Sequence, residues 1–412
     1  MRHTGQTGVV LRLGTTQTLA WASSYYLPAL LAAPLAAELG MAVTHVFGAF
    51  TLALVISALV GPAAGRAIDR HGGRAVLLAT NLLFAAGLAA LGFAQAEWQV
   101  WAAWCVVGVA MGSGLYDAAF ATLVRLYPVS ARNAITGITL IAGFASTVGW
   151  PLTQWGLDTL GWRGTCLGWA ALHIAVGLPL HRWLPRGRVE EMPAIQVAVS
   201  PDSHASTPAA TTHTSAGQGV ALVLAAVFAI AWFTSTAMAA HLPLLLQAQG
   251  LSASTALGVA MLVGPAQVAG RLLEFGFLRR AHPLLSSRFA TAGHPLGVLL
   301  LALGGPLGGW LFAVMHGMGN GILTIAKGTL PLVVFGAAGY GERQGWLMAP
   351  ARVAQAFAPV LFGLAMAHWG GRALWLTAGL GLLALALLQG LALHMARRDA
   401  VPATTPRPDA PA

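Results

Sequence analysis

The chain has 412 residues, of which 57% are hydrophobic and only 8% charged, whereas about 25% of the residues in a soluble globular protein are charged. This composition excludes an ordinary water-soluble protein. The formal charge of +10 does not indicate a nucleic-acid partner, because basic residues such as Arg74, Arg132 and Arg288 stand singly between apolar runs and form no patch.

The first part of the chain contains six apolar segments, each about as long as a helix that crosses a bilayer. We expect no removable signal peptide, because no early apolar region is followed by a small-residue cleavage site. The predicted spans are 12–35, 43–66, 74–95, 98–127, 134–157 and 164–184, within an N-terminal six-helix bundle of residues 1–184.

Residues 185–218 are rich in Pro, Ser, Thr and Ala, and they are predicted to form a mobile cytoplasmic linker. A second six-helix bundle, residues 219–396, follows, and a disordered tail, 397–412, ends the chain. The sequence therefore predicts an all-α membrane protein with twelve transmembrane helices in two pseudo-symmetric bundles. The second set of spans is 219–242, 254–278, 288–304, 306–328, 344–367 and 372–395.

The distribution of Lys and Arg predicts the orientation. With a cytoplasmic N-terminus, only Arg163 and Arg372 fall in outer loops, which leaves 22 − 2 = 20 of these residues on or near the cytoplasmic side. We expect a multi-pass protein of the cell inner membrane with both termini in the cytoplasm.

The two halves also repeat each other. The offsets are 264 − 61 = 203, 232 − 21 = 211 and 372 − 163 = 209, which indicates a repeat of about 207 residues. Such a repeat suggests two similar bundles with a binding site between them. The matching pairs are Gly61-Pro62 with Gly264-Pro265, Gly65-Arg66 with Gly270-Arg271, Ala20-Trp21 with Ala231-Trp232, and Gly161-Trp162-Arg163 with Gly370-Gly371-Arg372.

A charged loop lies between the second and third spans and reads Gly65-Arg66-Ala67-Ile68-Asp69-Arg70-His71-Gly72-Gly73-Arg74. It resembles the loop signature of the major facilitator superfamily of secondary transporters. In that family the acid and the arginines tie helix ends together and help to gate the cytoplasmic side. The resemblance assigns a gating role to Gly65, Asp69, Arg70, Gly72 and Arg74. Asp69 can accept hydrogen bonds from the free backbone N–H groups of a neighbouring helix.

The pattern is closest to the monocarboxylate and oxalate/formate branch of that superfamily. Residues 351–359, Ala-Arg-Val-Ala-Gln-Ala-Phe-Ala-Pro, look like the segment in which oxalate/formate transporters keep a substrate-binding cation. Residues 270–274 are similar to the segment in which the same branch keeps an arginine. The resemblance implies that Arg271 and Arg352 bind a small anion, although Arg352 stands where those transporters favour lysine.

Ionisable groups inside a bilayer cost at least about 2.5 to 3.5 kcal/mol each, so each needs a partner, a wet cavity or a function. Arg271 and Arg352 are expected at similar depths and could grip one carboxylate. The alternative is that Arg271 pairs with Glu274 while Arg352 extends to the headgroups.

Asp117 is the acid placed deepest in a predicted span. A carboxylate at a cavity wall can load and release a proton, which predicts a proton-coupling role. Asp117 also lies eight residues from Arg125 on one helix face. A bracing role would therefore explain the acid equally well.

Weaker signals complete the site. Several further residues could line a substrate cavity, although packing explains their aromatic members at least as well. Lys327 is expected to extend to the headgroups. His241, His316 and Met238 could suggest a path for a soft metal, but the spacing Met315-His316-Gly317-Met318 is not a known ligand set, and structural roles are the usual explanation of lone histidines. The further candidate substrate-binding residues are Trp21, Tyr25, Gln154, Asn320 and Gln355.

The leading hypothesis is secondary active transport of a small organic anion by alternating access, with a coupling proton or counter-anion as a second partner. The alternatives are proton-coupled efflux of a neutral or cationic compound, such as a drug or metalloid, and a membrane receptor or scaffold. We expect no enzyme, cofactor or metal, because the sequence has no phosphate-binding loop and no zinc-ligand spacing.

Overall fold

The computed structural model describes residues 2–187, 189 and 215–399, and all regular structure in these ranges is helical. The predicted all-α architecture is confirmed. Most of the predicted linker, 188 and 190–214, and the tail from 400 onward lie outside the described residues. Residues 215–218, predicted as linker, belong instead to a helix.

The helices of residues 2–182 form one bundle, here the N bundle. Several predicted spans consist of two helices that meet at a break, as at Leu115, where extended backbone separates α5 from α6. The helices are α1 (Arg2–Ser23), α2 (Pro28–Leu39), α3 (Val43–His71), α4 (Gly73–Gly92), α5 (Glu97–Gly114), α6 (Tyr116–Leu126), α7 (Ala131–Ala142), α8 (Ala145–Leu172), a π turn (His173–Gly177) and α9 (Leu178–Arg182).

The helices from Ser215 onward form the C bundle. The longest of them, α12, has non-helical backbone at Gly305, whose φ of 53° suits glycine and divides the helix into the predicted ninth and tenth spans. The helices are α10 (Ser215–Ala248), α11 (Ala253–Gly276), α12 (Pro283–Phe335), α13 (Tyr340–Trp369) and α14 (Ala373–Asp399), with short 3₁₀ turns at Leu278–Arg280 and Gly370–Arg372.

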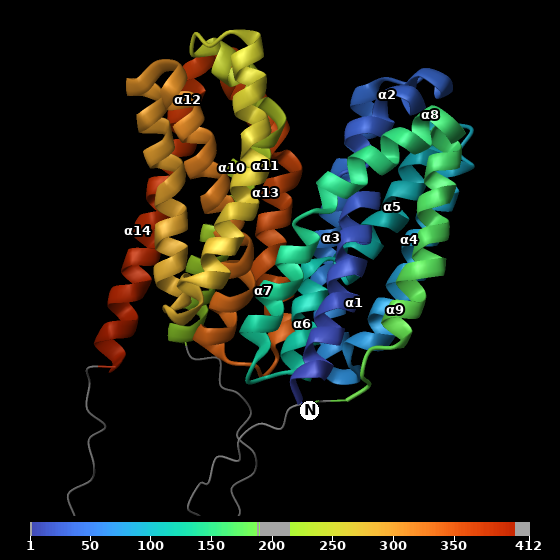
Figure 1. Cartoon of the computed structure of the whole chain (residues 1–412), viewed down its shortest axis with the longest axis horizontal. Helices are drawn as coiled ribbons and strands as arrows, with labels where there is room; N and C mark the ends of the chain where they lie inside the picture. The colour runs from blue at the N-terminus through green and yellow to red at the C-terminus, as the bar shows by residue number, and fades with distance from the viewer. Residues whose placement is uncertain (1, 188, 190–214, 400–412) are drawn as a thin grey trace, which may run out of the picture.

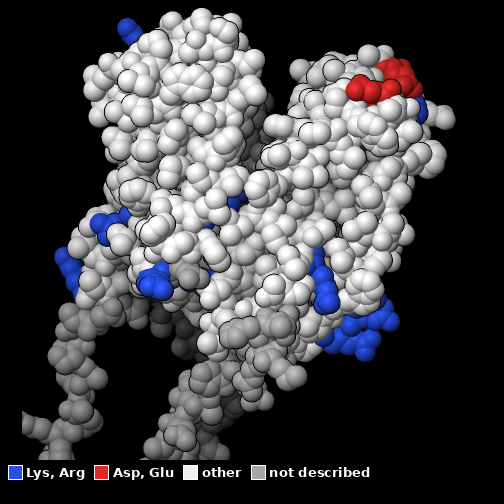
Figure 2. Space-filling model, viewed as in Figure 1, with Lys and Arg blue, Asp and Glu red and all other residues white. Residues whose placement is uncertain are grey.

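Eight segments of the described chain are long and apolar enough to cross a membrane. This number is smaller than twelve because residues 131–182, 283–335 and 340–397 each contain two predicted spans. The first predicted span is also absent from the eight, because a break separates α1 from α2. Between the acidic patch at one end and the basic side chains towards the other, the surface in Figure 2 shows almost no charged side chains, as expected of a surface in contact with lipid.

The two bundles stand side by side and meet at the end where the N-terminus lies, here the termini end (Figure 1). At the opposite end they separate, and Figure 2 shows a hollow between them there. Basic side chains lie mainly towards the termini end in this view, and the acidic patch lies at the opposite end.

Close contact at the termini end depends on glycines of α3 and α13. A Cβ on Gly65 would lie 2.0 Å from the carbonyl oxygen of Gly341, and a Cβ on Gly345 would lie 2.5 Å from backbone atoms of Pro62. Only glycine allows the two backbones to approach so closely. The termini end is therefore closed by a tight helix crossing, which leaves the hollow open only towards the opposite end.

Candidate functional site

An ion pair between the bundles lies at the centre of the candidate site. Asp117, in the first turn of α6, and Arg352, in the middle of α13, are each 8% exposed. Arg352 Nη2 donates to Asp117 Oδ2 at 2.5 Å, and Arg352 Nη1 donates to the hydroxyl of Ser57 on α3. Both carboxylate oxygens are occupied, because Gln344 Nε2 donates to Asp117 Oδ1 at 3.3 Å.

The contacts of this pair decide between alternatives that the sequence left open for Arg352 and for Asp117. Arg352 does not extend to the headgroups, because its guanidinium is bound inside the protein by Asp117. Arg125 does not pair with Asp117 and instead donates to the backbone carbonyls of Asp69 and Arg70. Distance explains the second result, because both residues lie on α6 and eight residues correspond to about 12 Å along a helix at ~1.5 Å per residue, too far for a direct ion pair.

Arg271, on α11, is 7% exposed and has no carboxylate partner in the described residues. The expected alternative pairing with Glu274 is wrong, because Arg132 of α7 holds the Glu274 carboxylate at 3.2 Å. The Arg271 guanidinium packs over Gly143, at the junction of α7 and α8. Its Nε is buried without a hydrogen-bond partner. Arg271 thus brings a buried, uncompensated positive charge to the boundary between the bundles.

Lys327, on the second part of α12, does not extend to the headgroups as predicted. It is only 4% exposed, and its Nζ lies 4.1 Å from the ring centre of Trp232 on α10 and 5.2 Å from that of Tyr116 on α6. The faces of these rings attract a cation electrostatically. The long side chain therefore remains at the boundary between the bundles.

Aromatic rings surround these charges. Trp21 of α1 stacks on Trp232 with ring centres 6.4 Å apart and planes 4° apart, and it also contacts Tyr25 and Tyr116 at 5.3 and 5.0 Å. The internal repeat pairs Trp21 with Trp232, so equivalent residues of the two halves meet between the bundles. The indole Nε1 of Trp21 is buried and has no hydrogen-bond acceptor.

The other predicted substrate-binding residues are not all placed together. Gln355 is buried on α13 with an unpartnered Nε2, and it lies near Tyr25. Gln154 is exposed on α8 and donates to Asp158 of the same helix at 2.8 Å. Asn320, on α12, donates to Ser235 at 2.7 Å.

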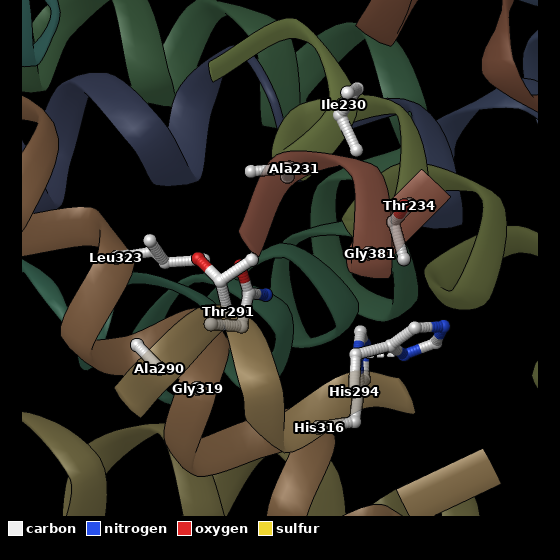
Figure 3. A pocket seen from close by; sticks show the side chains of 12 residues that line it. Ile230, Ala231, Thr234, Ala290, Thr291, His294, His316, Gly319, Leu323 and Gly381 are labelled. Atoms are coloured by element: carbon white, nitrogen blue, oxygen red, sulfur yellow. Dashed lines mark hydrogen bonds between the residues drawn. The ribbon is translucent and has the colours of Figure 1, made fainter. Parts of the chain in front are cut away.

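Asn320 also borders a cavity of about 40 Å³ inside the C bundle. Figure 3 shows His294 and His316 side by side at this cavity, with the Nδ1 atoms 3.0 Å apart. His294 Nε2 lies 3.0 Å from the hydroxyl of Thr377, which donates to a backbone carbonyl. His241 instead contacts the carbonyl of Pro359 at 2.8 Å. The two histidines considered as metal ligands therefore have different partners.

The segment predicted as a charged loop is helical except at Gly72, which separates α3 from α4, and it joins the bundles at the termini end. The Asp69 carboxylate accepts hydrogen bonds from the backbone N–H groups of Gly341 and Glu342, each at 2.9 Å, at the start of α13. This is the contact predicted from the sequence. Arg66 forms an ion pair with Glu342 at 2.6 Å. A carboxylate at a helix N-terminus is stabilised by the helix dipole.

Other loop residues support this joint within the N bundle. Arg70 contributes a carbonyl that accepts from Arg125 at 3.3 Å, and Arg74 donates to the carbonyl of Leu184 at 3.3 Å. Gly72 has a φ of 90°, which favours glycine. These contacts hold the ends of α3, α4 and α6 in place around Asp69.

A related joint exists in the second half. The offset of 205 residues that maps Gly65 onto Gly270 also maps Asp69 onto Glu274, since 274 − 69 = 205. Glu274 binds Arg132 at the start of α7, and Arg132 also donates to the carbonyls of Ala281 and Leu278. Sequence reasoning missed this role of Arg132, although the repeat carried the signal for Glu274.

We expect Gly65→Val to open the termini end. The new side chain would collide with the backbone of Gly341, so α3 and α13 must separate there. Spin labels on the two bundles at this end should show the inter-bundle distance increase by several ångströms, as in other rigid-body movements. Gly168→Val is the matched control, because a Cβ at Gly168 meets no atom within 4 Å. Unchanged distances in Gly65→Val would contradict the closing role of this crossing.

Comparison with known proteins adds to this geometry. The family model described as Major Facilitator Superfamily matches residues 13–340. No match is found among curated proteins. The proton:xylose symporter XylE bound to 6-bromo-6-deoxy-D-glucose is similar in structure, with a TM-score of 0.68 and 13% identity over 95% of this chain and 96% of that one. The human organic anion transporter MFSD10 (TETRAN) is similar with a TM-score of 0.64 and 18% identity over 94% of this chain and 99% of that one.

Proposed function

The chain belongs to the major facilitator superfamily and is a membrane transporter, not an enzyme; from this premise we propose that its substrate is a small organic anion. Transport proceeds by alternating access of the two bundles to a site between them. Arg271 and Arg352 bind the anion, and Asp117 carries or senses a coupling proton.

The observation that carries this proposal is the excess of positive charge at the site. Arg271, Lys327 and Arg352 contribute three cations and Asp117 one anion, a formal net charge of 3 − 1 = +2 among buried residues. Three buried donors there also lack acceptors: Trp21 Nε1, Arg271 Nε and Gln355 Nε2. An anion supplies both the missing charge and the missing acceptors.

We further propose that the termini end faces the cytoplasm and that the membrane is the cell inner membrane. The placement of Lys and Arg supports this orientation. With this orientation the hollow opens outward, and the contacts of Asp69, Arg66 and Arg132 close the inner side. The proposed bundles are residues 1–184 and 219–396, joined by the 185–218 segment.

Proton coupling follows from the position of Asp117. A proton on this carboxylate removes the negative charge that holds Arg352. The released guanidinium can then bind a substrate carboxylate through two hydrogen bonds. Proton and anion would therefore be taken up together, while the empty carrier keeps the internal ion pair. In the efflux alternative, Asp117 is essential and the arginines are structural.

Counterflow in liposomes tests the proposal. The purified full-length protein is reconstituted with an excess of an unlabelled carboxylate inside, and entry of the labelled compound is followed for a panel that includes oxalate and lactate. We expect at least one carboxylate to accumulate transiently, with no such signal in protein-free liposomes. If the whole panel fails while a pH gradient drives a cationic or neutral compound, the efflux alternative replaces the anion proposal.

A further inference from the structure

Lys327 is a buried cation whose ammonium group has no carboxylate bound to it within the described residues. No ion pair or hydrogen bond joins its Nζ to a carboxylate within the described residues, and only the rings of Trp232 and Tyr116 face it. Asp117 is close enough to attract it electrostatically. The oxygens of Asp117 are already bound by Arg352 and Gln344. The ammonium group therefore keeps its donors available for another acceptor.

Its position lies between the bundles, where a substrate would pass. Tyr116 belongs to the N bundle and Trp232 to the C bundle, so Lys327 contacts both. A small cavity lies beside it, lined partly by Asn320 and Thr324 of α12. This cavity of about 20 Å³ lies within the C bundle and has about the space that one water molecule needs, so polar groups surround the ammonium and a larger ligand requires the bundles to move apart.

Arg271 shares this neighbourhood. Its guanidinium packs over Gly143 of the N bundle, and it is close enough to Lys327 and Tyr116 to act on both electrostatically. Both cations are more than nine-tenths buried, and neither has a carboxylate partner among the described residues. Two such buried charges are costly unless a bound group compensates them.

We propose that Lys327 is a substrate-binding residue and that Lys327 and Arg271 bind the two carboxylates of a dicarboxylate. This inference rests on the proposed function and names its substrate class. The Asp117–Arg352 pair is internally neutral, so the charge left to compensate is that of Arg271 and Lys327. While this pair is intact, a dianion brings the site to neutrality, whereas a monoanion leaves one buried cation uncompensated. The rings of Trp232 and Tyr116 hold Lys327 in the site while it is empty.

The test compares linear dicarboxylates of increasing length with the monoamides that replace one of their carboxylates. Counterflow inhibition in liposomes at neutral pH gives the apparent affinity of each compound for wild type, Lys327→Gln and Lys327→Arg. We expect wild type to prefer a dicarboxylate over its own monoamide. In Lys327→Gln this preference should fall about 10- to 100-fold, the value of one charged hydrogen bond, and Lys327→Arg should retain most of it.

Arg372→Gln provides the matched control, because Arg372 is an exposed cation at the opposite end of the molecule. Size-exclusion profiles show whether each variant is folded. If Lys327→Gln does not fold, the wild-type ratio and Lys327→Arg decide the question. Equal affinities for dicarboxylate and monoamide, or an equal loss of both in Lys327→Gln, would overturn the inference while the anion proposal stands. If neither class of compound is exchanged, the proposed function itself fails.

Discussion

Arg271→Gln is expected to reduce carboxylate exchange about 100-fold or more, because removing one partner of a desolvated charge pair costs several kcal/mol of binding. The guanidinium is 7% exposed, carries no carboxylate partner among the described residues and keeps Nε unpaired. No internal ion pair is lost with it. The substitution should therefore affect substrate binding more than folding, as measured by the initial rate of counterflow in liposomes.

Arg271→Lys tests whether the positive charge alone is sufficient, without the planar guanidinium group. Lysine keeps a positive charge but offers a point charge on a flexible stem, so it cannot form two parallel hydrogen bonds with a carboxylate. We expect exchange in Arg271→Lys to be intermediate between wild type and Arg271→Gln. Wild-type rates in Arg271→Gln, with normal size-exclusion behaviour, would show that this arginine has only a structural role.

Asp117→Asn is expected to destabilise the protein by about 3 to 5 kcal/mol, the usual cost of leaving a buried charge without its partner. Arg352 would lose its carboxylate at a site where both residues are 8% exposed. The double variant Asp117→Asn/Arg352→Gln removes both charges and should regain most of that stability. The stabilities of wild type, Asp117→Asn and the double variant are compared by their unfolding midpoints in detergent, followed by tryptophan fluorescence.

Asp158→Asn is the control for this cycle, because Asp158 is exposed and, within the described residues, its side chain accepts a hydrogen bond only from Gln154 of the same helix. It should lower the midpoint little. If the double variant is as unstable as the single one, the ion pair contributes no coupling energy and Asp117 acts through other contacts, such as Gln344. In the transport assay, Asp117→Asn should also exchange anions without responding to a pH gradient.

The predicted spans follow from composition, and the structure places helices over each of them. Apolar runs of sufficient length must be helical in lipid, because each backbone donor and acceptor has to be satisfied inside the segment. Errors occur where a segment bends. The breaks at Gly161 and Gly305 fall between predicted spans, whereas the break at Leu115 lies inside the predicted span 98–127 and was not predicted.

The contact of Asp69 with the start of α13 agrees with the prediction that this carboxylate accepts from free N–H groups at a helix N-terminus, although Asp69 lies in the last turn of α3 and not in a loop. The repeat of Trp21 and Trp232 indicated equivalent positions, and the structure brings the two rings into contact. Sequence reasoning could not show this contact, because the repeat gives equivalence and not distance.

What the sequence by itself determined is the class of protein, the course of its helices and the small set of charges inside the membrane. Only the tertiary structure decided which charges compensate each other. Asp117 and Arg352 are 235 residues apart, and Glu274 binds Arg132 instead of Arg271, its neighbour on the same helix. Lys327 is held by two rings from different bundles. The physical reason is that an ion pair in a low-dielectric interior depends on distances of a few ångströms, and the packing of the bundles sets these distances.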